Sequence, residues 1–463
     1  MSDLAHNRFL DAPLTGLYAR TSLPIIFVMG MNGLLTVVDA LFLGHYVGPE
    51  ALAAVTLIFP LYMLLVAFAS LVSGGMSSLL ARHLGAGRVA AAHRLYASAH
   101  WLALSAGAAL IVLYVLAGAP MVRLAAGGNT GLAAMATTYL SVLVTFSPLL
   151  FVLSVNSDAL RNEGHVGVMA AMSLLVSLSN IIFDYLLIAV FDFGVAGSAW
   201  GTVLAQALAL SLIMAFRIRK GTILHPGAIL RHVTARDWGG ILALGAPQSL
   251  SFIGVALASS AILTALQLID SPDYTVTVSA YGIATRVMTF AFLPLLGLSQ
   301  AMQTITGNNH GAGLWPRRDT SLQVAAGAAL IFCAAVQLLV TLFAAGIGRA
   351  FVADPQVVAK VGAILPTMVA LFALSGPQMM LAAHFQAIGD ARRAAVLGLA
   401  KPYLFVLPLT FALPLMFGEA AIWWTGPSAE ALLLGLTALV LSQSARRQSL
   451  RWGLFATPVE VSQ

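Results

Sequence analysis

The feature that most constrains the fold of this chain is a series of twelve long apolar stretches separated by short polar segments. About 20 apolar residues are needed to cross roughly 30 Å of hydrocarbon. Stretches of this kind lie at 17–43, 51–81, 95–119, 131–157, 165–190, 195–216, 239–268, 275–307, 320–346, 357–387, 394–417 and 428–444. Because only 9% of the residues are charged, against about 25% in soluble domains, the sequence predicts an all-α protein that crosses a membrane twelve times.

The distribution of Lys and Arg predicts the orientation of these helices. If both termini are cytoplasmic, the inner loops hold most of the Lys and Arg residues, and the outer loops hold only Arg123, Arg349 and Lys360. Inner loops of membrane proteins carry an excess of basic residues. We therefore expect a multi-pass protein of the plasma membrane (the bacterial inner membrane) with both termini in the cytoplasm.

Several classes of function are disfavoured by what the sequence lacks. The polar start 1–20 has no small-residue cleavage site, so the first helix should stay in the membrane. The lone Cys333 excludes an internal disulfide framework and a Cys-cluster metal site. There is no phosphate-binding loop and no hydrolase motif. We expect neither an enzyme nor a nucleic-acid binder, with no cofactor besides a coupling ion, and we expect a monomer in the lipid bilayer.

The two halves of the chain resemble each other at a shift of about 225 positions. Segments 51–87 and 280–313 both end in Gly-Ala-Gly, and the pairs 23–24 and 246–247 both end in Pro. Six helices per half give both halves the same orientation, related by a pseudo-twofold axis along the membrane normal. The predicted division is an N-lobe at 1–216, a cytoplasmic linker at 217–238 and a C-lobe at 239–463. The alternative is that apolar helices resemble one another through composition alone.

Two acidic residues lie well inside predicted helices, and ionisable groups in a membrane are functional candidates because they are costly to bury. Asp39 is in the first helix and Asp184 in the fifth, with Asn180 one turn away on the same face. Thr202 and Tyr139 should lie at a similar depth on two other helices. Such a group can share a proton, can bind Na⁺ through Asp39, Asn180, Asp184 and Thr202, or can form a static hydrogen-bond network between helices.

Pro24 and the second half complete the candidates. Proline inside a helix removes a backbone hydrogen bond, so Pro24 is either a hinge of the first helix or a static kink. We expect no comparable buried acid in the second half, whose buried charges would be Arg286 and Lys401. Adaptable and polar side chains suggest a substrate cleft, although packing is the alternative. The cleft candidates are Met29, Asn32, Met172, Gln248, Arg286 and Met288.

Five short segments give the chain its resemblance to a known family. Segments 38–44 (VDALFLG) and 48–55 (GPEALAAV) resemble the first loop of the MATE (multidrug and toxic compound extrusion) family. Segments 159–164 (ALRNEG), 180–184 (NIIFD) and 194–202 (GVAGSAWGT) also resemble this family. The resemblance extends over nearly the whole chain and implies a V-shaped fold of two six-helix lobes. Acids confined to the first half resemble the DinF-like branch.

The resemblance also implies a function. Asp39 and Asp184 would be the coupling acids of an alternating-access antiporter that exports hydrophobic, cationic organic compounds. Ser154 stands where some relatives have an Asn proposed to help hold Na⁺, and Asn32 stands where a Gln is common. We therefore expect H⁺ rather than Na⁺ as the coupling ion. The alternative is a flippase for lipid-linked sugars from the same wider superfamily, which would need a more basic cavity to hold phosphates.

Overall fold

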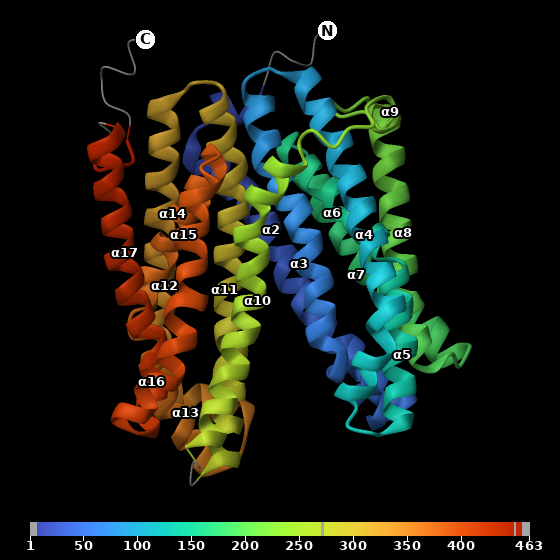
Figure 1. Cartoon of the computed structure of the whole chain (residues 1–463), viewed down its shortest axis with the longest axis vertical. Coiled ribbons are helices and arrows are strands. Elements are labelled where there is room, and N and C mark those ends of the chain that lie inside the picture. The colour runs from blue at the N-terminus through green and yellow to red at the C-terminus, as the bar shows by residue number, and fades with distance from the viewer. Residues whose placement is uncertain (1–6, 270–272, 449–450, 456–463) are drawn as a thin grey trace. The chain divides into compact units, whose positions relative to one another are not determined.

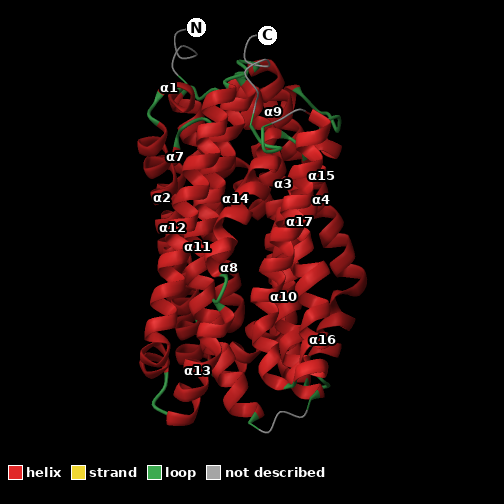
Figure 2. Cartoon of the chain, turned by 90° about the vertical axis from the view of Figure 1, so that its left-hand side faces the viewer, coloured by secondary structure: helices red, strands yellow, loops and turns green. Residues whose placement is uncertain are grey.

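The computed structural model describes residues 7–269, 273–448 and 451–455, and these residues are almost entirely helical. Figure 2 shows long helices joined by short loops and turns, with no strand in the part of the chain that is described. The helices form because long apolar runs satisfy their backbone hydrogen bonds internally, which is required in lipid. The prediction of an all-α membrane protein is confirmed.

Contacts divide the chain into two compact units. The first unit contains the described residues of Met1–Arg8 and Leu23–Ser249. The second contains Phe9–Ser22 and the described residues of Leu250–Gln463. The first helix therefore contributes its early turns to the second unit, where the Tyr18 hydroxyl lies 2.8 Å from the Ser321 hydroxyl.

Figure 1 labels most of the α-helices. After the short α1 (Arg8–Asp11), the elements up to the middle of α10 are α2 (Leu14–Phe42), η2 (Leu43–Val47), α3 (Pro49–Gly85), α4 (Val89–Ala125), α5 (Thr130–Thr145), α6 (Ser147–Asn162), α7 (Val166–Asp184), η3 (Tyr185–Val190), α8 (Gly194–Lys220), α9 (Gly227–Arg231) and α10 (Trp238–Leu268). The remaining elements are α11 (Tyr274–Gly311), α12 (Trp315–Phe351), α13 (Pro355–Met368), α14 (Phe372–Ile388), α15 (Ala391–Leu399), η4 (Ala400–Val406), α16 (Leu407–Phe417), η5 (Glu419–Trp424) and α17 (Thr425–Gln448).

The number of membrane spans agrees with the prediction. Ten spans in the described residues are long and apolar enough to cross a membrane, and two further spans are pairs of helices bent at a short break. Counting each bent pair as one span gives twelve.

The fourth and tenth spans differ from the predicted continuous helices. The fourth is α5 and α6, bent by 49° at Phe146, and the tenth is α13 and α14, bent by 48°. Pro148 in the first turn of α6 cannot donate a backbone hydrogen bond to α5, which explains the first break. In the tenth span, Gln337 of α12 stabilises the break, donating to the Ala370 carbonyl at 2.7 Å and accepting from the Ala373 amide at 2.9 Å. The breaks occupy equivalent places in the two halves, which supports the internal repeat.

The last span also begins differently from the prediction. Gly426 and Pro427 do not break the helix, because they lie in the first turn of α17, where a proline is tolerated. The chain turns instead at Gly418, whose φ of 80° favours glycine. The short η5 follows, so the span begins earlier than predicted and places residue 430 deeper inside it.

Small residues let two helices of the first unit cross closely. A Cβ on Gly75 of α3 would lie 1.9 Å from the Ile241 carbonyl oxygen of α10. A Cβ on Gly245 of α10 would lie 1.8 Å from the Leu71 carbonyl oxygen of α3. Only glycine fits at both places, and such small-residue contacts are typical of helix pairs in membranes.

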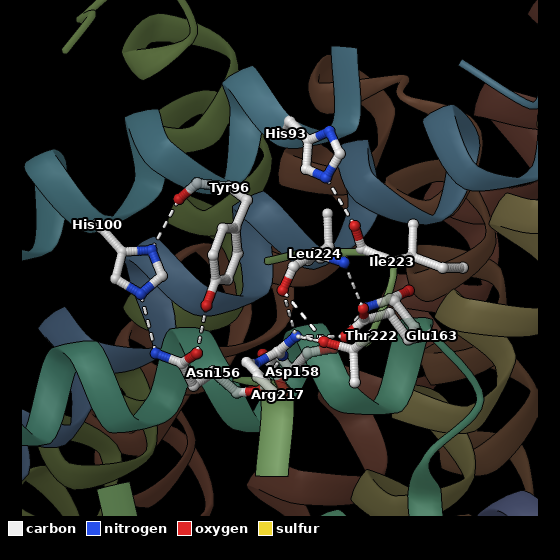
Figure 3. Close-up of polar contacts among 11 residues, drawn as sticks. His93, Tyr96, His100, Asn156, Asp158, Glu163, Arg217, Thr222, Ile223 and Leu224 are labelled. Carbon is white, nitrogen blue, oxygen red and sulfur yellow. Dashed lines mark hydrogen bonds and ion pairs between the residues drawn. The ribbon is translucent and has the colours of Figure 1, made fainter. Parts of the chain in front are cut away.

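The segment between α8 and α10 is held against the first unit by buried polar contacts (Figure 3). Arg217 at the end of α8 forms an ion pair with Glu163 at 2.6 Å, and both side chains are fully buried. Glu163 accepts from the Leu224 amide at 2.7 Å, and Arg217 donates to the Leu224 carbonyl at 3.1 Å. On α4, His93 contacts the Ile223 carbonyl at 2.6 Å. The predicted linker region is therefore docked on α4 and α6 rather than free.

Candidate functional site

Asp184 is the most deeply buried acid of the predicted site. It is the last residue of α7, and only 1% of it is exposed. Asn180, one turn earlier, donates to Asp184 Oδ1 at 3.3 Å and lies 3.4 Å from the Thr202 hydroxyl of α8. Helices α7 and α8 are neighbours in the first unit. The structure thus brings together three of the five predicted coupling residues on two adjacent helices.

Asp39 reaches the same cluster from α2. The Ser198 hydroxyl of α8 donates to Asp39 Oδ1 at 3.0 Å, and Thr202 donates to the Ser198 carbonyl at 3.2 Å. Asp39 is close enough to Asp184 for the two carboxyl groups to interact. Two carboxyl groups this close in a water-poor environment cannot both keep a full negative charge without a compensating cation.

Tyr139 completes the cluster from α5. Its side chain is 7% exposed and lies within hydrogen-bonding reach of Ser198. It is also close enough to both Asp39 and Asp184 to interact electrostatically. Tyr62 of α3 adds a second phenol that is close enough to Asp39 to interact with it electrostatically. All five predicted coupling residues therefore lie in one cluster, to which α2, α3, α5, α7 and α8 contribute.

Ser198 and Tyr62 belong to the cluster but were not predicted. Ser198 lies in the family-like segment 194–202, one turn before Thr202 on the same helix face. The spacing between Ser198 and Thr202 could therefore have predicted that Ser198 lies in the cluster. No sequence pattern could have predicted Tyr62, because its approach to Asp39 depends on how α3 packs.

Gly201 makes the space that the Asp184 carboxylate occupies. A Cβ at Gly201 would lie 2.1 Å from Asp184 Oδ1 and 3.2 Å from its Cγ. Such a distance is far below van der Waals contact, so any larger residue must displace the carboxylate. A glycine inside a helix is otherwise unfavourable, and here the close approach of the acid explains it.

We expect Gly201→Ala to destabilise the protein by about 1–3 kcal/mol through overpacking and to lower transport several-fold, because the carboxylate must move. The matched control is Gly167→Ala near the start of α7, where a Cβ would meet nothing within 4 Å. Thermal unfolding in detergent and efflux from vesicles would measure both effects. Equal behaviour of the two variants would contradict the steric role of Gly201.

Both acids of the cluster lie beside π-helical turns. Asp184 directly precedes η3, and Asp39 lies one turn before η2. The two π segments contact each other. Such turns are rare and occur frequently at functional sites. They widen the helix where the acids must be placed.

The donor set of this cluster suits a proton or a hard monovalent cation. Carboxylate, amide and hydroxyl oxygens are the ligands that alkali and alkaline-earth ions prefer. No group of three or more His, Cys, Asp or Glu side chains that could hold a metal ion occurs among the described residues. Ser154 donates to the Leu150 carbonyl of its own helix at 2.9 Å. The choice between H⁺ and Na⁺ remains a prediction.

The predicted hinge and cleft residues are distributed over both units. Helix α2 continues through Pro24 as a single helix, so its hinge role remains a prediction. Ser177 of α7 donates to the Asn32 side chain of α2 at 2.7 Å. Met29, Met172 and Gln248 are part-buried in the first unit, and Gln248 contacts α3 near Gly74. Arg286 and Met288 lie in the second unit. A common cleft therefore remains a prediction.

The expectation of no buried acid in the second half is wrong. Glu430 of α17 is 4% exposed and forms an ion pair with Lys401 of η4. Glu430 was missed because the predicted span began at 428, which placed this residue at a helix end. Arg286 lies inside the span formed by α11, as predicted, and its side chain is exposed at the surface of the helices.

A family model described as MatE matches the chain twice, at residues 24–186 and 251–412, which together cover most of its length. The chain belongs to the MatE family. The two matches fall one in each half, in agreement with the internal repeat. Members of this family are transporters rather than enzymes, so the expectation that this chain is no enzyme is confirmed. The DinF-like branch remains a prediction.

Curated relatives of this MatE protein cover nearly its whole length. The "FAD transporter" of Shewanella oneidensis is 26% identical over 441 residues, covering 94% of this chain and 95% of that protein. The "Multidrug export protein MepA" of Staphylococcus haemolyticus is 25% identical over 423 residues, covering 91% of each. The chain is therefore similar at full length to transporters with different named cargoes.

Solved structures of MATE proteins share this fold. A MATE in the bent conformation gives a TM-score of 0.84 at 23% identity and covers 97% of this chain and 99% of that chain. An outward-facing multidrug resistance MATE family transporter of the MOP superfamily gives 0.82 at 23% identity, covering 94% and 96%. These likenesses support the MATE fold of this multi-pass membrane protein.

Proposed function

We propose that this chain is a cation-coupled antiporter that exports hydrophobic, cationic organic compounds, with H⁺ preferred over Na⁺ as the coupling ion. The observation that carries the proposal is the pair of interacting acids Asp39 and Asp184, which converge from α2 and α7 within one unit. A buried acid pair that alternates between charge states can bind an ion in one conformation and release it in another. The relatives named as multidrug exporters support export as the direction of transport.

H⁺ is preferred because hydrogen-bond donors already point at Asp39 Oδ1 and Asp184 Oδ1, whereas the buried Asp184 Oδ2 has no partner among the described residues. Asn180, Ser198 and Thr202 direct donors toward the carboxylates or toward each other. A Na⁺ ion would need these groups to turn their oxygens inward together. A proton needs only one carboxyl oxygen and one acceptor, which the acid pair supplies by itself.

The orientation remains part of this proposal. We place both termini and the basic loops on the cytoplasmic side of the bacterial inner membrane, because basic residues gather in those loops. The acids would then lie in the outer half of the first unit. The coupling ion would enter there down its gradient.

The experiment that tests the proposal uses the purified protein in proteoliposomes loaded with ethidium. We expect an imposed pH gradient to drive ethidium movement and an imposed Na⁺ gradient at constant pH to drive little. Movement driven by Na⁺ alone would overturn the preference for H⁺. Ethidium and FAD should be tested side by side in the same vesicles.

A second candidate cargo is a dinucleotide, because one relative of similar identity is named a FAD transporter. Transport of FAD but not of ethidium would favour this candidate. The flippase alternative has less support, since Lys401 is neutralised by Glu430 rather than free to hold a phosphate. Arg286 by itself does not make a basic cavity.

A further inference from the structure

The second unit contains an ion pair inside its predicted membrane region that no part of the proposed mechanism uses. Lys401 of η4 contacts Glu430 Oε1 of α17, and the side chains are 28% and 5% exposed. The Ser375 hydroxyl of α14 donates to the same oxygen. One carboxylate oxygen therefore interacts with two donors, and the ammonium group remains partly accessible while the acid is enclosed.

The other oxygen of this carboxylate has no such support. Glu430 Oε2 is buried and has no hydrogen-bond partner among the described residues, and the same holds for Gln378 Oε1. Gln378 lies one turn after Ser375 on α14 and donates its Nε2 to the Glu430 backbone carbonyl at 3.3 Å, so its amide group lies beside Glu430. Two buried acceptors without donors are costly in a low-dielectric interior. A hydrogen on Glu430 Oε2 would turn this oxygen into a donor, and Gln378 Oε1 on α14 is a buried acceptor that still needs one.

Two charged groups in the elements packed against α17 are already paired, whereas Arg392 of α15 is exposed and His384 of α14 is buried. Lys360 of α13 pairs with Glu419 of η5 at 3.1 Å, and Arg393 of α15 pairs with Asp390 at 3.0 Å. Helix α16 contains no ionisable residue.

Among the described residues, Lys401 pairs with the Glu430 side chain, and Cys333 of α12 lies close enough to interact with it electrostatically. Cys333 is fully buried. Lys401 is therefore the countercharge in direct contact with Glu430.

A proton is a better ligand here than a metal ion. Lys401 already places one positive charge on the carboxylate, so a bound Na⁺ would bring two cations together in a buried site. A proton adds to Oε2 instead, neutralises the acid and breaks the ion pair. The charge of the pair then changes from zero to plus one, and it is carried by the partly exposed ammonium.

We propose that Glu430 is a proton-binding carboxylate of the second unit that takes up and releases a proton during transport, with Lys401 as its built-in counterion. The η4 segment supports this role. Lys401 lies in this π-helical turn, which also contains Pro402, and the two acids of the first unit likewise lie beside π-helical turns. The inference rests on the proposed transport function for its role in the cycle. Protonation itself can be measured without transport.

The first test measures protonation directly, by infrared difference spectroscopy of the purified protein in lipid nanodiscs between alkaline and acidic buffer without substrate. We expect the carbonyl stretch of protonated carboxylic acids to contain a component that Glu430→Gln removes. Glu419→Gln is the matched control, because Glu419 also pairs with a lysine, Lys360, but its side chain is 23% exposed against 5% for Glu430, and this variant should retain the component. The double variant Lys401→Met with Glu430→Gln leaves no unpaired charge and replaces the single variant if that one does not fold.

The second test measures transport in proteoliposomes under an imposed pH gradient, with ethidium and FAD as the two probes. We expect Glu430→Gln to lower the rate at least fivefold and Glu419→Gln to leave it unchanged. An unchanged infrared component in Glu430→Gln, or wild-type transport by this variant, would overturn the proposal. Loss of transport in Asp184→Asn with retention of the Glu430 component would separate this site from the acid pair of the first unit.

Discussion

Replacing Asp184 by Asn is expected to lower ion-driven efflux at least about tenfold, which corresponds to roughly 1.4 kcal/mol of lost coupling. Asn keeps the shape of Asp and can still interact with Asn180, but it cannot change its charge when an ion arrives. Asp39→Asn should have an effect of similar size, because the two carboxyl groups act as one pair. Efflux from everted vesicles under a pH gradient measures both.

The same Asp184→Asn change is expected to raise the free energy of unfolding by an amount on the order of 1 kcal/mol. The buried Asp184 carboxyl group and the Asp39 carboxyl group disfavour each other's charged form, and a neutral amide at position 184 removes that conflict. Functional sites often trade stability for activity in this way. A variant that is more stable but inactive would separate a coupling role from a structural one.

Asp192→Asn is the matched control for these variants. Asp192 is exposed, follows η3 in the same part of the first unit and has a φ of 55°, a conformation that Asn adopts readily. We expect wild-type efflux and stability from it. If Asp39→Asn and Asp184→Asn both exported substrate at the wild-type rate, the proposed coupling mechanism would be wrong.

Replacing Arg217 by Met is expected to cost about 3–5 kcal/mol of stability, the range for breaking a fully buried ion pair. Glu163 would then remain buried without its countercharge, since both side chains are completely enclosed. The segment that contains Leu224 would lose one of its attachments as well, because Arg217 donates to the Leu224 carbonyl. Thermal or denaturant unfolding in detergent would measure the loss.

A double-mutant cycle identifies the cause of this loss. Arg217→Met combined with Glu163→Gln should recover a large part of the stability, because no unpaired charge remains and Gln can still accept from the Leu224 amide. Arg219→Met is the control on the same helix end, where the side chain is exposed, and it should change stability by less than about 0.5 kcal/mol. Strict additivity of the two single losses would contradict the ion-pair explanation.

Particular residues show how far local patterns can predict this molecule. The positions of Asp39, Asp184, Asn180 and Thr202 follow from helical spacing and from depth in spans of known direction, so their convergence could be predicted. The same reasoning could have predicted that Ser198 belongs to this cluster. It could not have predicted that Glu430 is buried, because Gly418 and η5 shift the start of the last span, and that shift depends on where the chain turns.

The bends of the fourth and tenth spans illustrate the same limit. Pro148 signals the first bend in the sequence, but the second depends on Gln337 of another helix, which satisfies the backbone groups left by the break. Long-range contacts of this kind carry no local signal. Tyr62 beside Asp39 is a further example.

The amino-acid sequence by itself determined that this chain is a twelve-span membrane protein of two related halves, because apolar length and the placement of basic residues are local properties that lipid strictly enforces. It also determined which acids in the first half are costly enough to need a function. Only the tertiary structure decided which groups neutralise each buried charge, namely Lys401 for Glu430 and Arg217 for Glu163. Those pairings depend on distances of a few ångströms between helices that are far apart in the chain, where a low dielectric makes each contact decisive.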